Sequence, residues 1–171
     1  MIFRIVRGVD ATVIWLCVAA MVVLVGVMTA TVVAGVFWRY ALNAPLSWSE
    51  EVARFAMIWA AFVGGALAFR RGGHIAIALI VDALPVPLRR ALLLFGGVLT
   101  LGFLWILFWY GWTLAEQVRF QRSPALRMSM RYAYAAVPVG AALMIYHMLA
   151  AAVASLWQEG RDRPATPTGI G

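Results

Sequence analysis

The sequence NAPLSWSEEVARFAMIWAAFVGGALAFRRGGH, residues 43–74, decides how the rest of the chain is interpreted, because it contains both ends of one membrane-crossing helix. Pro45 disfavours the helical conformation at the residue before it. Ser47 and Glu50 have the three-residue spacing of a capping box, in which each side chain accepts a hydrogen bond from a free backbone N–H at the helix start. A helix is therefore expected to begin just after the proline.

The rest of the segment is apolar. No charged residue occurs from Phe55 to Phe69, and Arg70 and Arg71 end the run. Small residues recur at every fourth position, a spacing that lets a second helix approach closely within lipid. They are Ala60, Gly64 and Ala68 on one line, and Ala61 and Gly65 on another. The segment predicts a transmembrane helix that packs against a neighbour.

The start of this helix carries more charge than a cap requires. Glu50 and Glu51 lie at the positive end of the helix dipole, and Arg54 follows Glu50 by one turn in the favourable acid-before-base order. One interpretation is a well-capped span with no further role. The other is a polar anchor for a partner protein, and its candidate contacts are Asn43, Trp48, Glu50, Glu51, Arg54 and His74.

The composition as a whole is that of an integral membrane protein. Of the 171 residues, 64% are hydrophobic and 12% are charged, and the mean hydropathy is +0.89. A soluble domain has about half apolar and about a quarter charged residues. The net charge of +7 comes from arginines at the ends of apolar runs, which indicates membrane topology and lipid headgroups rather than nucleic acid. The single cysteine, Cys17, excludes an internal disulfide.

The chain is predicted to be an all-α integral membrane protein with four transmembrane helices and a short interfacial amphipathic helix. The first apolar run is too long for a signal peptide, so we expect it to remain as a span. Pro138 should kink the last span. The predicted regions are an N-terminal segment at 1–10, a membrane domain at 11–158 with spans at about 11–38, 48–69, 91–115 and 132–157, an interfacial segment at 75–84, and a flexible tail at 159–171.

The distribution of arginines predicts the orientation of these spans. An even number of spans places both termini on the same side of the membrane. Eight arginines lie near the termini and in the connection between the second and third spans, whereas six lie on the other side. Because cytoplasmic segments carry the excess of basic residues, we expect both termini in the cytoplasm. The basic connection at 116–131 then faces the opposite side, against the usual bias.

The sequence contains no recognisable catalytic constellation, cofactor motif or metal-ligand set. To ligate a haem, its two histidines would have to lie at one depth, and the topology places His74 at the headgroups and His147 within the last span. We expect His147 to be hydrogen-bonded inside the bundle. The span midplanes otherwise lack the ionisable residues that mark ion and substrate paths. This pattern favours an accessory or scaffold subunit that is not an enzyme.

Several motifs together resemble one family of membrane proteins. The pattern NAPLSWSEEVAR at 43–54, followed by FRRGGHI at 69–75, is similar to the small membrane subunit (DctQ type) of tripartite ATP-independent periplasmic (TRAP) transporters. SPAL at 123–126 and VPVGAALM at 137–144 also resemble that family. The likeness extends over roughly residues 10–157 and rests on the order and spacing of the motifs.

The resemblance implies a location and a set of partners. A subunit of this type works in the bacterial inner membrane with a large permease, which carries the sodium and substrate sites. A periplasmic binding protein delivers an organic acid, such as a C4-dicarboxylate, a sialic acid or another carboxylate. The small subunit would belong to the fixed scaffold beside a moving transport domain. It would contact membrane lipid and require no cofactor.

Two questions stay open at the level of sequence. Arg119, Arg122 and Arg127 in the basic connection either dock the binding protein or contact lipid headgroups. The alternative function is a membrane anchor of a redox enzyme that holds haem or quinone, because aromatic residues crowd one end of the third span. Such clusters are typical of the membrane interface, and a quinone pocket is the other interpretation.

Overall fold

The computed structural model describes residues 2–70 and 85–161. Their regular structure is helical, with one isolated antiparallel β-bridge between Arg122 and Ser129. The helices are α1 (Ile2–Ala41), α2 (Ser49–Arg70), α4 (Val86–Gln117), the 3-10 turn η1 (Val118–Phe120), α5 (Arg131–Tyr134) and α6 (Ala136–Arg161). The predicted interfacial segment at 75–84 and the candidate contact His74 lie outside the described residues.

Four helices in this part of the chain are long and apolar enough to cross a membrane, which confirms the predicted all-α membrane fold. Their large apolar side chains mostly face outward, and Trp15, Phe95 and Trp109 are each more than half exposed. Lipid solvates such a surface, whereas water would not. The candidate spans are Asp10–Ala41, Ser49–Arg70, Pro87–Phe120 and Arg131–Val153.

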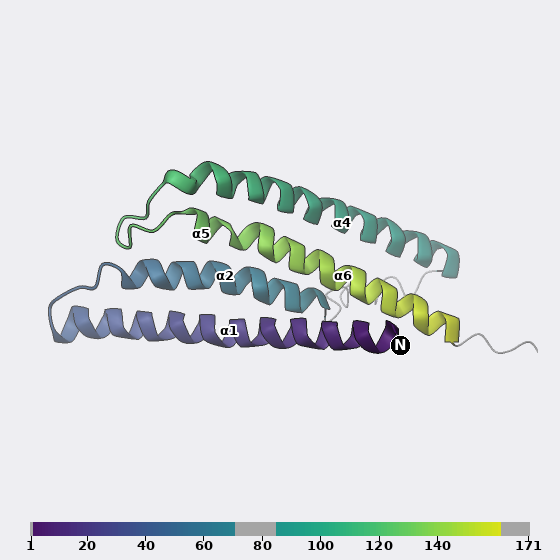
Figure 1. Ribbon diagram of the computed structural model, residues 1–171, viewed down its shortest axis with the longest axis horizontal. Helices are drawn as coiled ribbons and strands as arrows, with labels where there is room; N and C mark the ends of the chain where they lie inside the picture. Colours follow the sequence, from purple (N-terminus) through teal and green to yellow (C-terminus); the bar gives the residue numbers. More distant parts are fainter. Residues whose placement is uncertain (1, 71–84, 162–171) are drawn as a thin grey trace, which may run out of the picture.

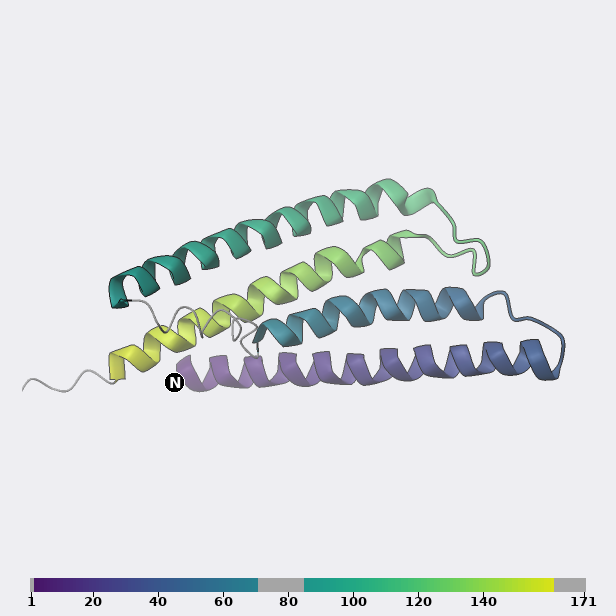
Figure 2. The ribbon, with the colours of Figure 1, turned by 180° about the vertical axis from the view of Figure 1, so that it is seen from behind.

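The helices lie side by side in one layer, in the order α1, α2, α6, α4 (Figures 1 and 2). Helices α2 and α6 form the central pair, while α1 packs on α2 and α4 packs on α6. The chain runs up and down, so the loops at 42–48 and 121–130 share one end of the layer, which we call the loop end (Figure 1). The start of α1 and the end of α6 lie at the opposite end, as four crossings require.

The predicted small-residue lines of α2 are used within the chain. Gly64 faces Met21 of α1, and Gly65 faces Met144 of α6. A Cβ atom added to Gly65 would lie 2.8 Å from Met144 Cε, which is closer than real Cβ contacts come. The two lines therefore serve two different neighbours, one on each side of α2.

Glycine also sets the approach of α6 to its neighbours. A Cβ atom on Gly140 would lie 2.6 Å from Phe62 Cβ of α2, and one on Gly111 of α4 would lie 2.8 Å from Val137 Cγ1 of α6. Because the side chain of Phe62 is fixed at its Cβ by the backbone, the first contact leaves no room for even a methyl group. Residue size thus determines how closely the central pair packs.

The last span is interrupted near its start, where Pro138 predicted a kink. Pro138 has no N–H to donate to the carbonyl group of Tyr134, one helical turn earlier. Helix α5 ends at Tyr134 and α6 begins after Ala135. Close to this break, the indole Nε1 of Trp59 in α2 donates a hydrogen bond to the carbonyl oxygen of Tyr132, at 2.9 Å. The interruption is thereby tied to the central neighbour.

Toward the end of the layer opposite the loops, the described residues include one interhelical ion pair and one buried histidine. Asp10 of α1 and Arg70 of α2 form an ion pair with each other. His147 of α6 is fully buried, and neither of its ring nitrogens has a hydrogen-bond partner among the described residues. The expectation of a hydrogen-bonded His147 is therefore wrong for the described residues. Asp10 and Arg70, whose charges act on this histidine, bind one another instead.

Candidate functional site

The loop end brings together the start of α2 and the connection between α4 and α5, which are more than 70 residues apart in sequence. Residues 121–130 of this connection fold back on themselves, and we call them the hairpin. Of the six predicted anchor contacts, five lie in or beside the loop that precedes α2 or in its first two turns, and His74 is not described. The site is therefore an assembly of one helix start and one hairpin.

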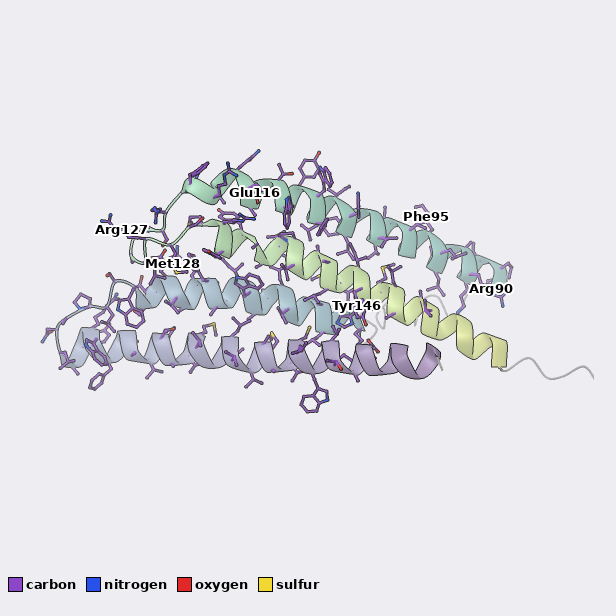
Figure 3. The ribbon with its side chains drawn as sticks, viewed as in Figure 1. Arg90, Phe95, Glu116, Arg127, Met128 and Tyr146 are labelled. Atoms are coloured by element: carbon purple, nitrogen blue, oxygen red, sulfur yellow. The ribbon has the colours of Figure 1, made fainter. Side chains whose placement is uncertain are left out.

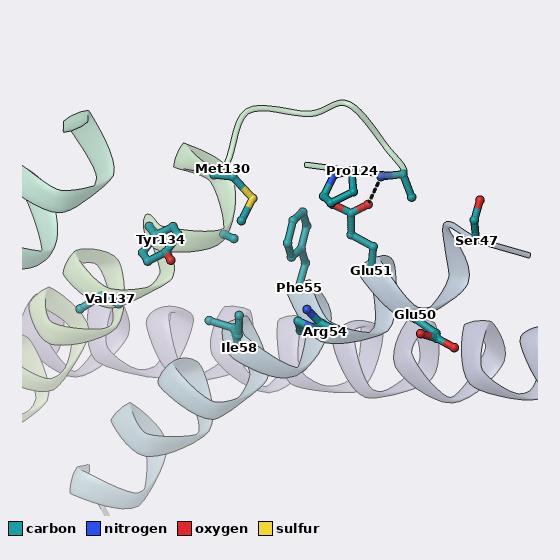
Figure 4. Close-up of a pocket in the computed structure, with 12 residues that line it drawn as sticks. Ser47, Glu50, Glu51, Arg54, Phe55, Ile58, Pro124, Met130, Tyr134 and Val137 are labelled. Carbon is teal, nitrogen blue, oxygen red and sulfur yellow. Dashed lines mark hydrogen bonds between the residues drawn. The ribbon is translucent and has the colours of Figure 1, made fainter. Parts of the chain in front are cut away.

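Glu51 is the link between these two parts. Its Oε2 atom accepts hydrogen bonds from the backbone N–H groups of Ala125 and Leu126, each at 2.9 Å. Figure 4 shows the first of these bonds. The hydroxyl group of Ser123, which is buried, lies beside the same carboxylate without a well-oriented hydrogen bond. Hydrogen bonds from N–H groups to a charged carboxylate are stronger than those between neutral groups. Glu51 thus holds the hairpin onto α2.

The hairpin is also held by its own backbone. The N–H of Ser123 donates to the carbonyl oxygen of Met128 at 2.8 Å, and the N–H of Met130 donates to that of Gln121 at 2.9 Å. The turn between these bonds contains Arg127 in the left-handed region, with φ of 55°. That conformation is uncommon for a residue with a side chain, so the surrounding hydrogen bonds must maintain it. The hairpin is a defined structure rather than an open loop.

Glu116 fastens the base of the hairpin. One carboxylate oxygen lies 2.6 Å from Arg131 Nη2, and the other lies 3.5 Å from Arg119 Nη1. The Ser129 hydroxyl donates to the carbonyl oxygen of Arg119 at 2.6 Å. Arg131, which had no assigned role in the sequence, therefore bridges α5 to the end of α4. Figure 3 shows Glu116 at this end of α4.

The predicted capping box between Ser47 and Glu50 is not formed in the described structure. The Glu50 carboxylate instead binds Arg39 of α1, with 2.7 Å between Oε1 and Nη2. Helix α2 begins at Ser49, whose hydroxyl donates to the carbonyl oxygen of Leu46 at 2.8 Å. The correction has a physical reason, since the arginine at the end of α1 offers Glu50 a full charge instead of a backbone N–H.

Ser49 is a structural residue that sequence reasoning missed. It is buried, and a Cβ atom on Gly35 of α1 would lie 2.6 Å from its Oγ. The two helices therefore touch where α2 begins. A small polar residue two positions after another serine gives no distinctive signal, so the sequence could not identify it.

A groove runs between α2 and the start of the last span, and we call it the α2–α5 groove (Figure 4). Its volume is about 460 Å³. Glu50, Glu51 and Arg54 lie at its polar end, and its other lining residues are Ser47, Phe55, Ile58, Pro124, Ala125, Met130, Ala133, Tyr134 and Val137. Arg54 is exposed, and it forms no ion pair or hydrogen bond with any described residue.

The remaining predicted contacts lie on the surface of the loop end. Asn43 adopts the left-handed conformation with φ of 50°, and Trp48 is exposed. Arg119 stacks over the ring of Phe120, with 4.5 Å from its Cζ to the ring centroid, and Arg122 donates to the carbonyl oxygen of Arg127. The side chain of Arg127 has no partner in the described structure and lies at the tip of the hairpin (Figure 3).

This arrangement suits recognition and not catalysis. Within residues 2–70 and 85–161, no group of three His, Cys, Asp or Glu side chains is placed to hold a metal ion. The carboxylates of the loop end already bind arginines or backbone N–H groups. What the site offers to the outside is a fixed hairpin with exposed arginines above an apolar groove.

Comparison with known proteins identifies a family. Residues 28–159 match the family described as tripartite ATP-independent periplasmic transporters, DctQ component. The sialic acid TRAP transporter small permease protein SiaQ of Vibrio cholerae is 31% identical over 65% of this chain and 64% of its own length. The ectoine TRAP transporter small permease protein TeaB of Halomonas elongata is 35% identical over 66% of this chain and 60% of its own length.

Longer proteins also contain a region similar to this chain. The sialic acid TRAP transporter permease protein SiaT of Haemophilus influenzae is 23% identical over 80% of this chain, but the match covers only 22% of SiaT. The first curated relatives are themselves matched over less than two thirds of their length, from 44% to 64%. The likeness thus concerns only a part of each of these proteins.

Proposed function

The chain belongs to the DctQ family of TRAP transporter components, and we propose that it acts as the small membrane subunit of such a transporter. In this role it would be an accessory or scaffold subunit that works with a large permease to import an organic acid, with sodium as the coupling ion. The observation that carries the proposal is the family match over residues 28–159, which includes the whole site at the loop end.

Support for a large permease partner comes from the longer relatives. SiaT and the isethionate TRAP transporter permease protein DctMQ of Oleidesulfovibrio alaskensis each contain a region similar to this chain within a much longer protein. A region that is part of the same polypeptide as the rest of a permease is held beside it. We infer that this chain binds a separate large permease in the corresponding manner.

The transported compound is proposed only as a class. Relatives named for sialic acid, ectoine and C4-dicarboxylate transport are 31%, 35% and 30% identical to this chain. Because these values are nearly equal, identity does not select one substrate. A C4-dicarboxylate, a sialic acid or another carboxylate is the proposed cargo.

We propose that the loop end faces the periplasm and that both termini face the cytoplasm of a bacterial inner membrane. The eight-to-six distribution of arginines supports this orientation. In this orientation the exposed arginines of the hairpin would meet a periplasmic binding protein. The redox-anchor alternative gains no support from the relatives compared here, all of which are named as transporter components.

The proposal is tested by reconstitution. The chain is co-expressed with a large TRAP permease from the same genome and purified through a tag on this chain alone. We expect the permease to co-purify, and we expect proteoliposomes of the pair to take up the organic acid only when sodium and the binding protein are both present. Absorbance in the haem Soret region, or equal uptake by the permease without this chain, would contradict the proposal.

A further inference from the structure

The polar end of the α2–α5 groove has both hydrogen-bond donors and hydrogen-bond acceptors that are not used within the described structure. Arg54 has five N–H donors and no acceptor among the described residues. A carboxylate offers about four acceptor positions, and Glu51 uses two of them for the hairpin. Even with the Ser123 hydroxyl counted, one position on Glu51 remains open. At the mouth of one groove there thus lie a guanidinium group that makes no hydrogen bond to the described residues and, within range of its charge, a carboxylate with an open acceptor position.

The charges at this mouth balance one another. Glu50 and Glu51 carry two negative charges, while Arg39, bound to Glu50, and Arg54 carry two positive charges. A purely anionic ligand would gain from Arg54 but would be repelled by Glu51. A ligand with one negative and one positive group, spaced by a short linker, satisfies both residues. The groove mouth is therefore complementary to a zwitterion.

The depth of the groove indicates the rest of the ligand. The candidate span begins at Ser49, and Arg54 lies about 7.5 Å further along the helix axis at 1.5 Å per residue. Ile58 of α2 and Val137 of α6 line the groove still further from the loop end. The groove thus changes from charged to apolar in the direction of the membrane interior, as a phospholipid does.

We propose that the α2–α5 groove binds one phospholipid with a primary ammonium headgroup, of the phosphatidylethanolamine class. Its phosphate group binds Arg54, its ammonium group binds Glu51, and one acyl chain lies against Phe55, Ile58 and Val137. Arginine is well suited to phosphate, and three N–H donors of the ammonium group can reach a carboxylate oxygen. The groove volume of about 460 Å³ falls within the roughly 300–1,000 Å³ that is usual for ligand sites.

The lipid would complete the junction between α2 and the hairpin. Its ammonium group adds a counter-charge to the carboxylate that already holds Ala125 and Leu126. This inference rests on the membrane location of the chain and not on its role in transport, so the two can fail separately.

The test measures lipid retention by native mass spectrometry of the purified full chain. Phosphatidylethanolamine, phosphatidylcholine and phosphatidylglycerol with identical acyl chains are titrated in one detergent. We expect phosphatidylethanolamine to be retained about tenfold more strongly than the other two, since phosphatidylcholine has no N–H donors and phosphatidylglycerol has no cation. Equal retention of the three lipids overturns the proposal without the use of any variant.

Two variants and one control locate the lipid. Arg54→Gln should lower retention of phosphatidylethanolamine about tenfold, and Ile58→Trp should lower retention of all three lipids by filling the groove. Arg127→Gln is the control, because Arg127 lies on the hairpin but does not line the groove. This variant should retain lipid as the unaltered chain does. If Arg54→Gln instead releases a co-expressed permease while lipid retention is unchanged, the groove is a protein contact and the lipid proposal is wrong.

Discussion

The central helices and the outer helices of the layer differ in how fully their surfaces are used. Along α2 and α6, Gly65 and Gly140 each have a side chain of the other helix within 3 Å of where a Cβ would lie. On the outer helices, Gly26 of α1 and Gly102 of α4 have nothing within 4 Å. The outer helices also pack closely where they face the central pair, at Gly35 of α1 and Gly111 of α4, so the open surface is confined to their outward faces.

The polar contacts show the same difference. Two hydrogen-bonding contacts join α2 to the α5 region and the hairpin: Trp59 to Tyr132, and Glu51 to two backbone N–H groups. Helix α1 is joined to α2 by ion pairs at its ends, and the pair between Arg39 and Glu50 is well exposed to solvent. The contacts of the central pair α2 and α6, which we also call the central seam, therefore give the fold its specificity, while the outer faces are left for lipid or a partner protein.

The largest effect is expected at the helix crossing of the central pair. Gly140→Ala places a methyl group 2.6 Å from Phe62 Cβ, so the helices must separate, and we expect a loss of about 1–3 kcal/mol of stability. Gly102→Ala on the outer helix meets no atom and removes a flexible residue from a helix, so it should be neutral or stabilising by up to about 1 kcal/mol. Thermal unfolding in detergent measures both.

The opposite signs of these two variants are the critical result. Both replacements change Gly to Ala inside an apolar helix, so helix propensity cancels in the comparison. The two sites differ in surroundings, because Gly140 is buried against Phe62 whereas Gly102 is exposed. Equal unfolding temperatures for Gly140→Ala and Gly102→Ala would show that the central seam is no more tightly packed than the outer face.

The second-largest effect is expected at Glu51, and the adjacent Glu50 serves as its control. Glu51→Gln keeps the shape of the side chain but removes the charge that the N–H groups of Ala125 and Leu126 bind, so the hairpin should open more often. We expect amide hydrogen exchange in the hairpin to become about tenfold faster. Glu50→Gln, which breaks only an exposed ion pair with Arg39, should leave this exchange unchanged.

The same pair of variants tests whether these residues serve structure or ion coupling. Both carboxylates lie at a helix start and not at a span midplane, so neither replacement should alter the ratio of sodium to substrate in the proposed transport reaction. Altered coupling with normal hairpin exchange in Glu51→Gln would refute the structural role. A further measurement, co-purification with the permease, should fall more for Glu51→Gln than for Glu50→Gln.

The third effect concerns the outward surface of the hairpin. Arg127→Gln removes the arginine whose side chain has no partner in the described structure, so the fold should be unaffected. If the hairpin meets an acidic surface of a binding protein, uptake should slow severalfold at low binding-protein concentration and low salt, and the difference should shrink as salt rises. Arg119 and Arg122 are less clean targets because they also contact Glu116 and the backbone.

Arg90→Gln, at the opposite end of the layer, is the matched control for this loss of charge. If Arg127→Gln and Arg90→Gln support equal uptake across the whole titration, the docking role of the hairpin is refuted. Lipid headgroups are then the partners of its arginines. Labelling of a cysteine placed at Ser123 only from the cytoplasmic side would refute the orientation on which the docking role depends.

Much of the fold could be predicted from sequence because it depends on local signals. Apolar runs bounded by arginines indicated the spans, and the lines through Gly64 and Gly65 indicated close packing. Pro138 indicated the interruption that separates α5 from α6. Each of these signals involves residues within a turn or two of the feature they determine, so a single sequence is sufficient to recognise them.

The partners of the charged residues could not be predicted, because they come from distant parts of the chain. The position of Glu51 at a helix start predicted an interaction with the helix dipole, yet its hydrogen bonds are to residues 125 and 126. Glu50 was expected to cap its own helix and binds Arg39 instead. Nothing in the spacing of the connection showed that it folds into a hairpin. The order of helices in the layer, with α1 on one side of α2 and α6 on the other, decides these contacts.

The smallest effect is expected at His147, where the central pair departs from its own pattern. This side chain is fully buried in α6, and its two ring nitrogens have no hydrogen-bond partner in the part of the chain that the structure describes. A buried polar group without a partner destabilises a fold, so replacing it with an apolar residue of similar size should cost nothing and can be favourable. His147→Leu is therefore expected to leave the unfolding temperature of the chain unchanged or to raise it slightly. His147→Ala, which leaves a cavity beside Tyr146, should lower it and serves as the control for lost volume. A clear loss of stability or of permease binding in His147→Leu would mean that the imidazole binds a group supplied from outside the described residues. His147 would then have a polar partner, as Glu51 and Trp59 of the central seam do.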